Sequence, residues 1–248
     1  MRKLVTAATI VLAVLVGVSG CATALSSTGT PLTVEQSEQL ASARFGVYAG
    51  GEYTAEISYR DEEDIDHVSA TLTVDPATKR AWGEISRGPA GLAVSEPVML
   101  TQHYLVVNGA TGWQESNLPD PARAAMHAVF LLAYDRPDNA SLLRQTDAVY
   151  LGEAAAGGVT YSVFRLPSAD SSTGSGETGD TDTQGNFGGT NTPTTGSTSG
   201  TRLWLDPDGR LKRLDVSDGT AFSIQLTDAT PAPQPSGAAT VWGILEQQ

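Results

Sequence analysis

The sequence has a single cysteine, Cys21, so the chain cannot form an intramolecular disulfide. It is also poor in basic residues, with 15 Lys and Arg against 28 Asp and Glu and a net charge of −13. Nucleic acids and anionic lipid surfaces are bound through basic patches, which this balance does not provide. The composition therefore excludes nucleic acid as an expected partner, and the acidity mainly keeps the protein in solution.

Recognisable catalytic and metal-binding motifs are also absent from the sequence. There is no Gly-x-Ser-x-Gly elbow, phosphate-binding loop or His-Glu-x-x-His motif. The three histidines, His67, His103 and His127, lack metal-ligand spacing and are expected to be surface or packing residues. The acidic segment 61–66, with Asp61 to Asp64 and Asp66, lacks the glycine and spacing of a calcium loop, which favours a solvated hairpin tip. We therefore expect no catalytic residue, no metal, no cofactor and no enzymatic activity.

The N-terminus has the features of a secretory signal. Arg2 and Lys3 precede an apolar run at residues 4–18, which is too short to span a bilayer comfortably. The sequence Val18-Ser19-Gly20-Cys21 then resembles the lipobox of bacterial lipoproteins, in which the cysteine carries a diacylglyceryl anchor and becomes the mature N-terminus. The alternative is an ordinary signal peptide with a cysteine at its cleavage site. The resemblance predicts that Cys21 anchors the protein to the extracytoplasmic face of the bacterial cell membrane.

The composition along the chain predicts one domain with a tether and an insertion. Residues 1–20 are the predicted signal peptide, and residues 21–32 are a predicted flexible tether rich in Ala, Ser and Thr. Residues 33–245 form the single predicted domain. Within it, residues 168–200 are almost entirely Ser, Thr, Gly, Asp, Asn and Gln, and this composition predicts disorder, because little apolar surface is available to offset ordering entropy.

Alternation of apolar and hydroxyl side chains dominates the rest of the chain. This period of two is typical of a sheet with one face in water. Strands are expected at residues 53–59, 68–74, 79–86, 104–107, 111–115, 149–153, 159–166, 203–206, 211–216 and 222–227, with a broken edge strand within 88–97 and a last edge strand at 241–245. Asn108-Gly109 is a strong hairpin-turn signal between two of these strands.

Three short helices are predicted between the strands. Thr33 and Gln36 fit a capping box for a helix that ends near Phe45. A second helix is expected to begin with Asp120 as its N-cap and to be apolar nearly all round. Asp138 or Asn139 is expected to cap the third.

Together these elements predict an α+β fold, a curled antiparallel half-barrel of about ten strands with a few short helices on its concave face. The curling is expected because sheets this wide tend to curl. Helices of this size would leave an apolar groove, which is typical of a binding surface. A filled core is the alternative, and the sequence alone does not separate the two. The predicted lining residues are Met126, Val129 and Phe130 of the second helix with Leu72 and Trp82 of the sheet.

The C-terminal part resembles a known group of proteins. Residues 158–164 and the segment 203–214, with Trp204 followed by an Asp-Pro-Asp-Gly turn, are similar to the LppX/LprG-type envelope lipoproteins, which are related in fold to the LolA/LolB lipoprotein carriers. The resemblance implies a half-barrel whose helices close a cavity for acyl chains. It therefore implies a lipid or acylated ligand as partner, with membrane attachment through Cys21. The alternative is a non-catalytic module that docks another envelope protein.

Overall fold

The computed structural model describes residues 25–60, 67–89, 93–167, 200–218 and 220–246. Its strands are β1 (Thr30–Pro31), β2 (Tyr53–Arg60), β3 (His67–Asp75), β4 (Arg80–Gly88), β5 (Val94–Leu100), β6 (Leu105–Gly109), β7 (Gly112–Glu115), β8 (Val149–Ala156), β9 (Val159–Arg165), β10 (Thr201–Leu205), β11 (Leu211–Asp218) and β12 (Thr220–Thr227). The helices are α1 (Val34–Ala49), α2 (Asp120–His127), the 3-10 helix η1 (Ala128–Leu131), α3 (Ala140–Leu143) and α4 (Ala238–Leu245).

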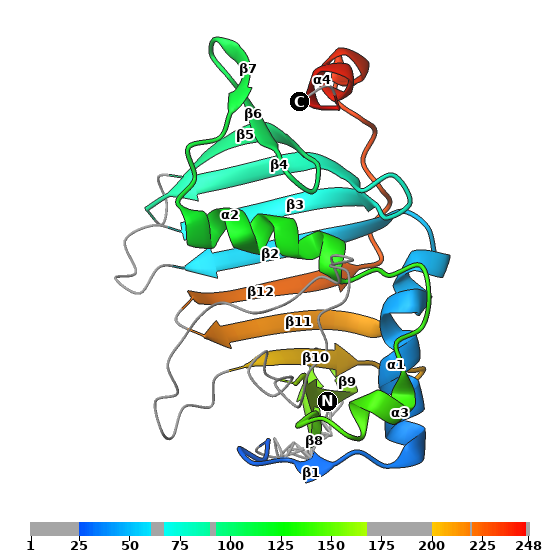
Figure 1. The fold of residues 1–248 in the computed structure, drawn as a ribbon. Helices are drawn as coiled ribbons and strands as arrows, with labels where there is room; N and C mark the ends of the chain where they lie inside the picture. Colours follow the sequence, from blue (N-terminus) through cyan, green and yellow to red (C-terminus); the bar gives the residue numbers. More distant parts are fainter. Residues whose placement is uncertain (1–24, 61–66, 90–92, 168–199, 219, 247–248) are drawn as a thin grey trace, which may run out of the picture.

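All twelve strands belong to one antiparallel sheet (Figure 1), in the order β1-β8-β9-β10-β11-β12-β2-β3-β4-β5-β6-β7. The sheet is not closed, because β1 and β7 do not pair with each other. This confirms the prediction of an antiparallel sheet with a few short helices, with two more strands than expected. The curvature of a half-barrel stays a prediction. Residues 25–32 of the predicted tether include β1, which pairs with β8, and Leu32, which is 9% exposed.

The two faces of the sheet differ in what covers them. We call the face that carries Ile57 and Leu72 the inner face, and the face that carries Glu56 and Thr71 the outer face. The main core lies between the inner face and the helices α1, α2 and η1. In Figure 1, α2 crosses in front of the middle strands while α1 and α3 lie together at one end of the sheet. Burial on one side and hydroxyl groups on the other confirm the alternation expected from the sequence.

Helix α4 covers part of the outer face, and the predicted edge strand at residues 241–245 is wrong. The four buried residues of α4 are Ala238, Val241, Trp242 and Leu245, which follow the i, i+3, i+4, i+7 spacing of a helix. They form a second core with Trp82, Met99 and Val106 of the sheet. The prediction that the helices lie on one face therefore holds for α1 to α3 but not for α4. A run as short as Val-Trp-Gly-Ile-Leu, with four apolar residues and a glycine, does not distinguish a short strand from a buried helix.

The helix ends follow the predicted caps in two cases of three. Thr33 and Gln36 form the capping box, with bonds of 3.0 and 3.2 Å, although α1 runs on to Ala49. Asn139 caps α3 by accepting from two backbone N–H groups. Asp120 is not the N-cap of α2, because the carbonyl of Pro119 already accepts the first helical bond.

Two strand boundaries also differ from the expectation. Asn108 and Gly109 pair with Trp113 and Gly112, so the turn is formed by the two residues between them. Gly112 has the positive φ, 96°, that this hairpin requires. Gly112, and not Gly109, is therefore the glycine on which the turn depends. The expected broken edge strand is divided between the end of β4 and β5, and β5 lies inside the sheet between β4 and β6.

Gly83 of β4 permits a close approach of β3. A Cβ atom at this position would lie 2.0 Å from the carbonyl oxygen of Thr71, a backbone atom that cannot move aside alone. Gly83→Ala is therefore expected to lower the free energy of unfolding by about 3 kcal/mol, which lowers the melting temperature by about 6–12 °C. Gly46→Ala in α1 is the matched control, since an added Cβ meets no atom within 4 Å and should stabilise slightly. Equal melting temperatures of the two variants would contradict this account.

Candidate functional site

Four of the five predicted lining residues come together where α2 and η1 pack against the sheet. Met126 lies on α2, Val129 and Phe130 lie on η1, and Leu72 lies on the inner face of β3, all in the main core. Trp82 lies on the outer face, where it packs against α4 and donates its Nε1–H to the Ala232 carbonyl (2.8 Å). Trp82 therefore does not share a space with the other four.

The space between this helical segment and the sheet is filled by side chains. We call residues 120–131, which form α2 and η1, the helical cover. Leu72, Met126 and Val129 have no exposed surface, and Phe130 is 6% exposed. A side chain with no accessible surface borders no void large enough for a water molecule. The cover is therefore closed on the sheet in this structure.

The helical cover is fixed to the sheet by polar contacts at both of its ends. The Tyr53 hydroxyl of β2 donates to the Val129 carbonyl (2.6 Å) at the C-terminal end. Burial raises the pKa of Tyr53 well above its usual value, so the hydroxyl keeps the proton it donates. At the other end, Arg123 donates to the Ser116 carbonyl (2.9 Å) and lies near Glu115 (3.3 Å).

The segment after the cover is attached to α1. The Arg44 guanidinium forms a two-pronged ion pair with Asp138, with Nε to Oδ2 at 3.0 Å. The backbone N–H groups of Tyr134 and Asp138 donate to the carbonyls of Arg44 (3.2 Å) and Ala41 (2.9 Å). These contacts hold the chain on the C-terminal side of the cover.

His127 at the end of α2 carries little charge near neutral pH. Its pKa is lowered by burial first, and a hydrogen bond with the Thr101 backbone opposes this shift. The positive charges of Arg123 and His103 lower the pKa further. Its Nδ1 is buried without a hydrogen-bond partner among the described residues. The neutral ring fits a packing role, as the sequence predicted.

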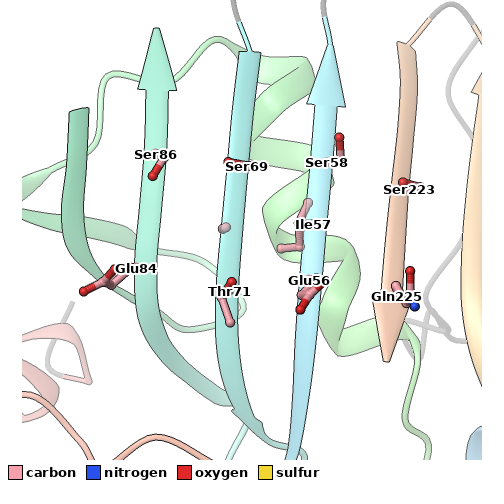
Figure 2. A pocket seen from close by; sticks show the side chains of 10 residues that line it. Glu56, Ile57, Ser58, Ser69, Thr71, Glu84, Ser86, Ser223 and Gln225 are labelled. Atoms are coloured by element: carbon pink, nitrogen blue, oxygen red, sulfur yellow. The ribbon is translucent and has the colours of Figure 1, made fainter. Parts of the chain in front are cut away.

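A depression of about 320 Å³ lies on the outer face, away from the predicted lining residues. It crosses β12, β2, β3 and β4 (Figure 2). The residues that line it are Glu56, Ile57, Ser58, Ser69, Ala70, Thr71, Glu84, Ser86, Ser223 and Gln225; Ile57 and Ala70 belong to the inner face by their register. The alternation in the sequence showed that this face would be hydroxyl-rich, but it gave no strand order and therefore could not bring these side chains together.

Several predictions concern residues outside the described part of the chain. Cys21, the acidic residues 61–66 and residues 168–199 of the insertion all belong to this group. Within the described ranges, no three His, Cys, Asp or Glu side chains are grouped as metal ligands. None of the helices described has the length and apolar character needed to cross a membrane.

Comparison with known proteins gives structural likenesses only. No family model and no curated protein sequence matches the chain. Among solved structures, LprF from Mycobacterium bovis matches with 15% identity and a TM-score of 0.47, over 84% of this chain and 99% of LprF. LprF is a lipoprotein of the LppX/LprG group that the sequence resembles.

Two further solved structures match over similar parts of the chain. MucB in complex with MucA(peri) has 13% identity and a TM-score of 0.33, over 81% of this chain and 57% of MucB. The chain thus spans a little over half of that MucB structure. A DUF1329 family protein from Desulfovibrio piger has 12% identity and a TM-score of 0.34, over 83% of this chain and 95% of that protein.

Proposed function

We propose that this protein is a non-enzymatic lipoprotein of the bacterial cell envelope, anchored through Cys21, which binds the acyl chain of a lipid or lipid-like ligand. The ligand would lie between the helical cover and the inner face, bordered by Leu72, Met126, Val129 and Phe130. Binding requires that the cover move away from the sheet. The protein would then carry its ligand across the envelope or present it to a partner.

The observation that carries this proposal is how small the helical cover is relative to what it covers. Three of its buried residues are alanines, at 122, 125 and 128, whereas the inner face beneath carries Ile57, Leu72 and Ile224. Alanine buries little apolar area, so separating the cover from the sheet costs less free energy than separating a leucine-rich helix. The strip that would be uncovered is continuous and apolar, which is the surface that an acyl chain fits.

A second candidate function is a docking module with a permanently filled core. It is favoured by the complete burial of Leu72, Met126 and Val129, which leaves no room for a ligand unless the cover moves. On this alternative, an envelope protein would bind the outside of the molecule and the cover would be purely structural. The two candidates differ in whether the protein carries lipid when it is isolated.

Native mass spectrometry of the full chain, produced in its own host and released gently from membranes, tests the proposal. We expect adducts whose mass matches a lipid found in the organic extract of the same sample. A chain without such adducts would favour the docking module.

Tyr53→Phe sharpens this test, because it removes the shorter of two hydrogen bonds to the buried Val129 carbonyl and leaves only the Leu132 N–H (3.2 Å) as its donor. We expect a fall in the melting temperature of about 2–8 °C, for a loss of about 1–2 kcal/mol. Hydrogen exchange should accelerate in residues 120–131 more than in β2 and β3, and a fluorescent fatty acid should be taken up faster. Tyr48→Phe, on the half-buried part of α1, is the control. Unchanged exchange in the cover would show that this bond does not hold it closed.

A further inference from the structure

The outer face carries two rows of polar side chains that cross the sheet in register. In the first row, Ser223, Ser58, Ser69 and Ser86 are direct neighbours on β12, β2, β3 and β4. Figure 2 shows these four serines following one another across the strands. Because adjacent strands lie about 4.8 Å apart, the hydroxyl groups repeat at that spacing. The row borders the depression described above.

The second row is longer and contains both charged and neutral groups. Its members, in register from β10 to β4, are Trp204, Arg213, Gln225, Glu56, Thr71 and Glu84. Six strands at about 4.8 Å give a row about 24 Å long. Side chains paired in this way lie on the same face of the sheet. The row therefore extends the depression toward β10 and ends there in an aromatic group.

The side chains at the β10 end are held in a fixed arrangement. The Arg213 guanidinium lies over the Trp204 ring, 5.0 Å from its centroid. Asp215 fixes both: it accepts from the Trp204 Nε1–H (2.8 Å) and from Arg213 Nε (2.6 Å). Tyr161 packs edge-on against Trp204 at 6.1 Å. The hydrogen bond that Arg213 makes within the described residues uses its Nε, so its two terminal nitrogens can donate to another molecule.

We propose that these two rows bind a carbohydrate chain that lies across the strands, from Trp204 and Arg213 to Glu84. Carboxylate and amide oxygens accept hydrogen bonds from sugar hydroxyls, and serine and threonine hydroxyls both donate and accept. The Trp204–Arg213 stack gives a flat surface for the apolar face of a sugar ring. The chemistry of the rows thus fits a ligand that is rich in hydroxyl groups and has little net charge.

Other occupants fit these rows less well. A peptide that adds a strand needs a free sheet edge, but β12, β2, β3 and β4 are all interior. An apolar partner would need exposed apolar side chains, whereas the lining side chains that point out of the sheet are Ser, Thr, Gln and Glu. A basic peptide could pair with Glu56 and Glu84, but these lie two strands apart and share their row with Arg213. A carbohydrate is therefore the occupant that the rows favour, and this inference is independent of the lipid site.

Calorimetric titration of the detergent-solubilised mature chain tests the inference. The probes are neutral oligosaccharides of glucose, mannose, galactose and arabinose, polysaccharide extracted from the host envelope, and a lysine-rich peptide. We expect at least one carbohydrate to bind. Ser69→Leu, which fills the centre of the depression, should weaken that binding about ten-fold or more. Thr160→Leu is the control, on an exposed strand position that does not line the depression.

A double variant separates a carbohydrate from a cationic ligand. Glu56→Gln with Glu84→Gln keeps the shape and the acceptor oxygens while it removes both charges, so carbohydrate binding should weaken only a few-fold and change little with salt. If the lysine-rich peptide binds instead, and the double variant and added salt both abolish that binding, the face belongs to a cationic partner and the inference is overturned. Failure of every carbohydrate to bind would also overturn it. Neither result bears on lipid adducts of the same chain.

Discussion

Cys21→Ala is expected to release the protein from the membrane fraction or to leave it as an uncleaved precursor. The reason is that the predicted anchor is the diacylglyceryl group on this residue, and two acyl chains are what makes such attachment stable. Without it, no helix of the described residues is long and apolar enough to replace the anchor. Fractionation of host cells shows whether the protein is released from the membrane fraction, and its intact mass shows whether the signal peptide has been cleaved.

The control for this prediction is Ser19→Ala, which keeps a small residue within the lipobox-like sequence. That variant should remain in the membrane fraction with the mass of an acylated chain. A Cys21→Ala protein of mature size that still sediments with membranes would refute the anchor. It would then favour the ordinary signal peptide and require another means of attachment.

The parts of the fold that could be predicted from the sequence depend on local physics. The capping box of α1 depends on only four consecutive residues, Thr33 to Gln36, and it is present in the structure. The alternation in residues 53–59 and 68–74 likewise sets which side chains are buried, because a strand presents successive residues to opposite faces. Neither feature depends on where the rest of the chain lies.

The features that the sequence did not predict depend on partners far away along the chain. Residues 241–245 form a helix because Trp82 and Met99, more than a hundred positions earlier, give its apolar side a surface to cover. The turn beyond Gly109 is set by the pairing of Asn108 with Trp113. Short apolar runs and single turn signals are weak indicators when such tertiary contacts compete with them.

In the candidate sites, too, the features set by the local sequence were predicted and those set by distant parts of the chain were not. The apolar character of residues 122–133 predicted that Met126, Val129 and Phe130 would lie against the sheet, and they do. Trp82 was wrongly grouped with them, because the sequence does not show which face of β4 it occupies or what covers that face. The two rows on the outer face were beyond prediction, because β10 to β12 and β2 to β4 become neighbours only through the pairing of β12 with β2.

Val129→Asp is expected to destabilise the fold more than either Gly83→Ala or Tyr53→Phe. Val129 has no exposed surface and lies among the apolar residues of the main core. A carboxylate at this position must be buried without a partner or must be protonated, and either state costs free energy. We expect a loss of about 4 kcal/mol or more, a large part of the stability of a typical domain.

Circular dichroism of Val129→Asp should show a melting temperature lower by about 8–16 °C or no cooperative transition at all. Val94→Asp is the matched control, since Val94 is 61% exposed and a carboxylate there stays in water. A folded Val129→Asp protein with a nearly unchanged melt would mean that the helical cover opens readily enough to hydrate the charge. That result would overturn the closed core and would strengthen the proposal that a ligand enters beneath the cover. A severe loss of stability leaves Tyr53→Phe as the variant that tests whether the cover can open.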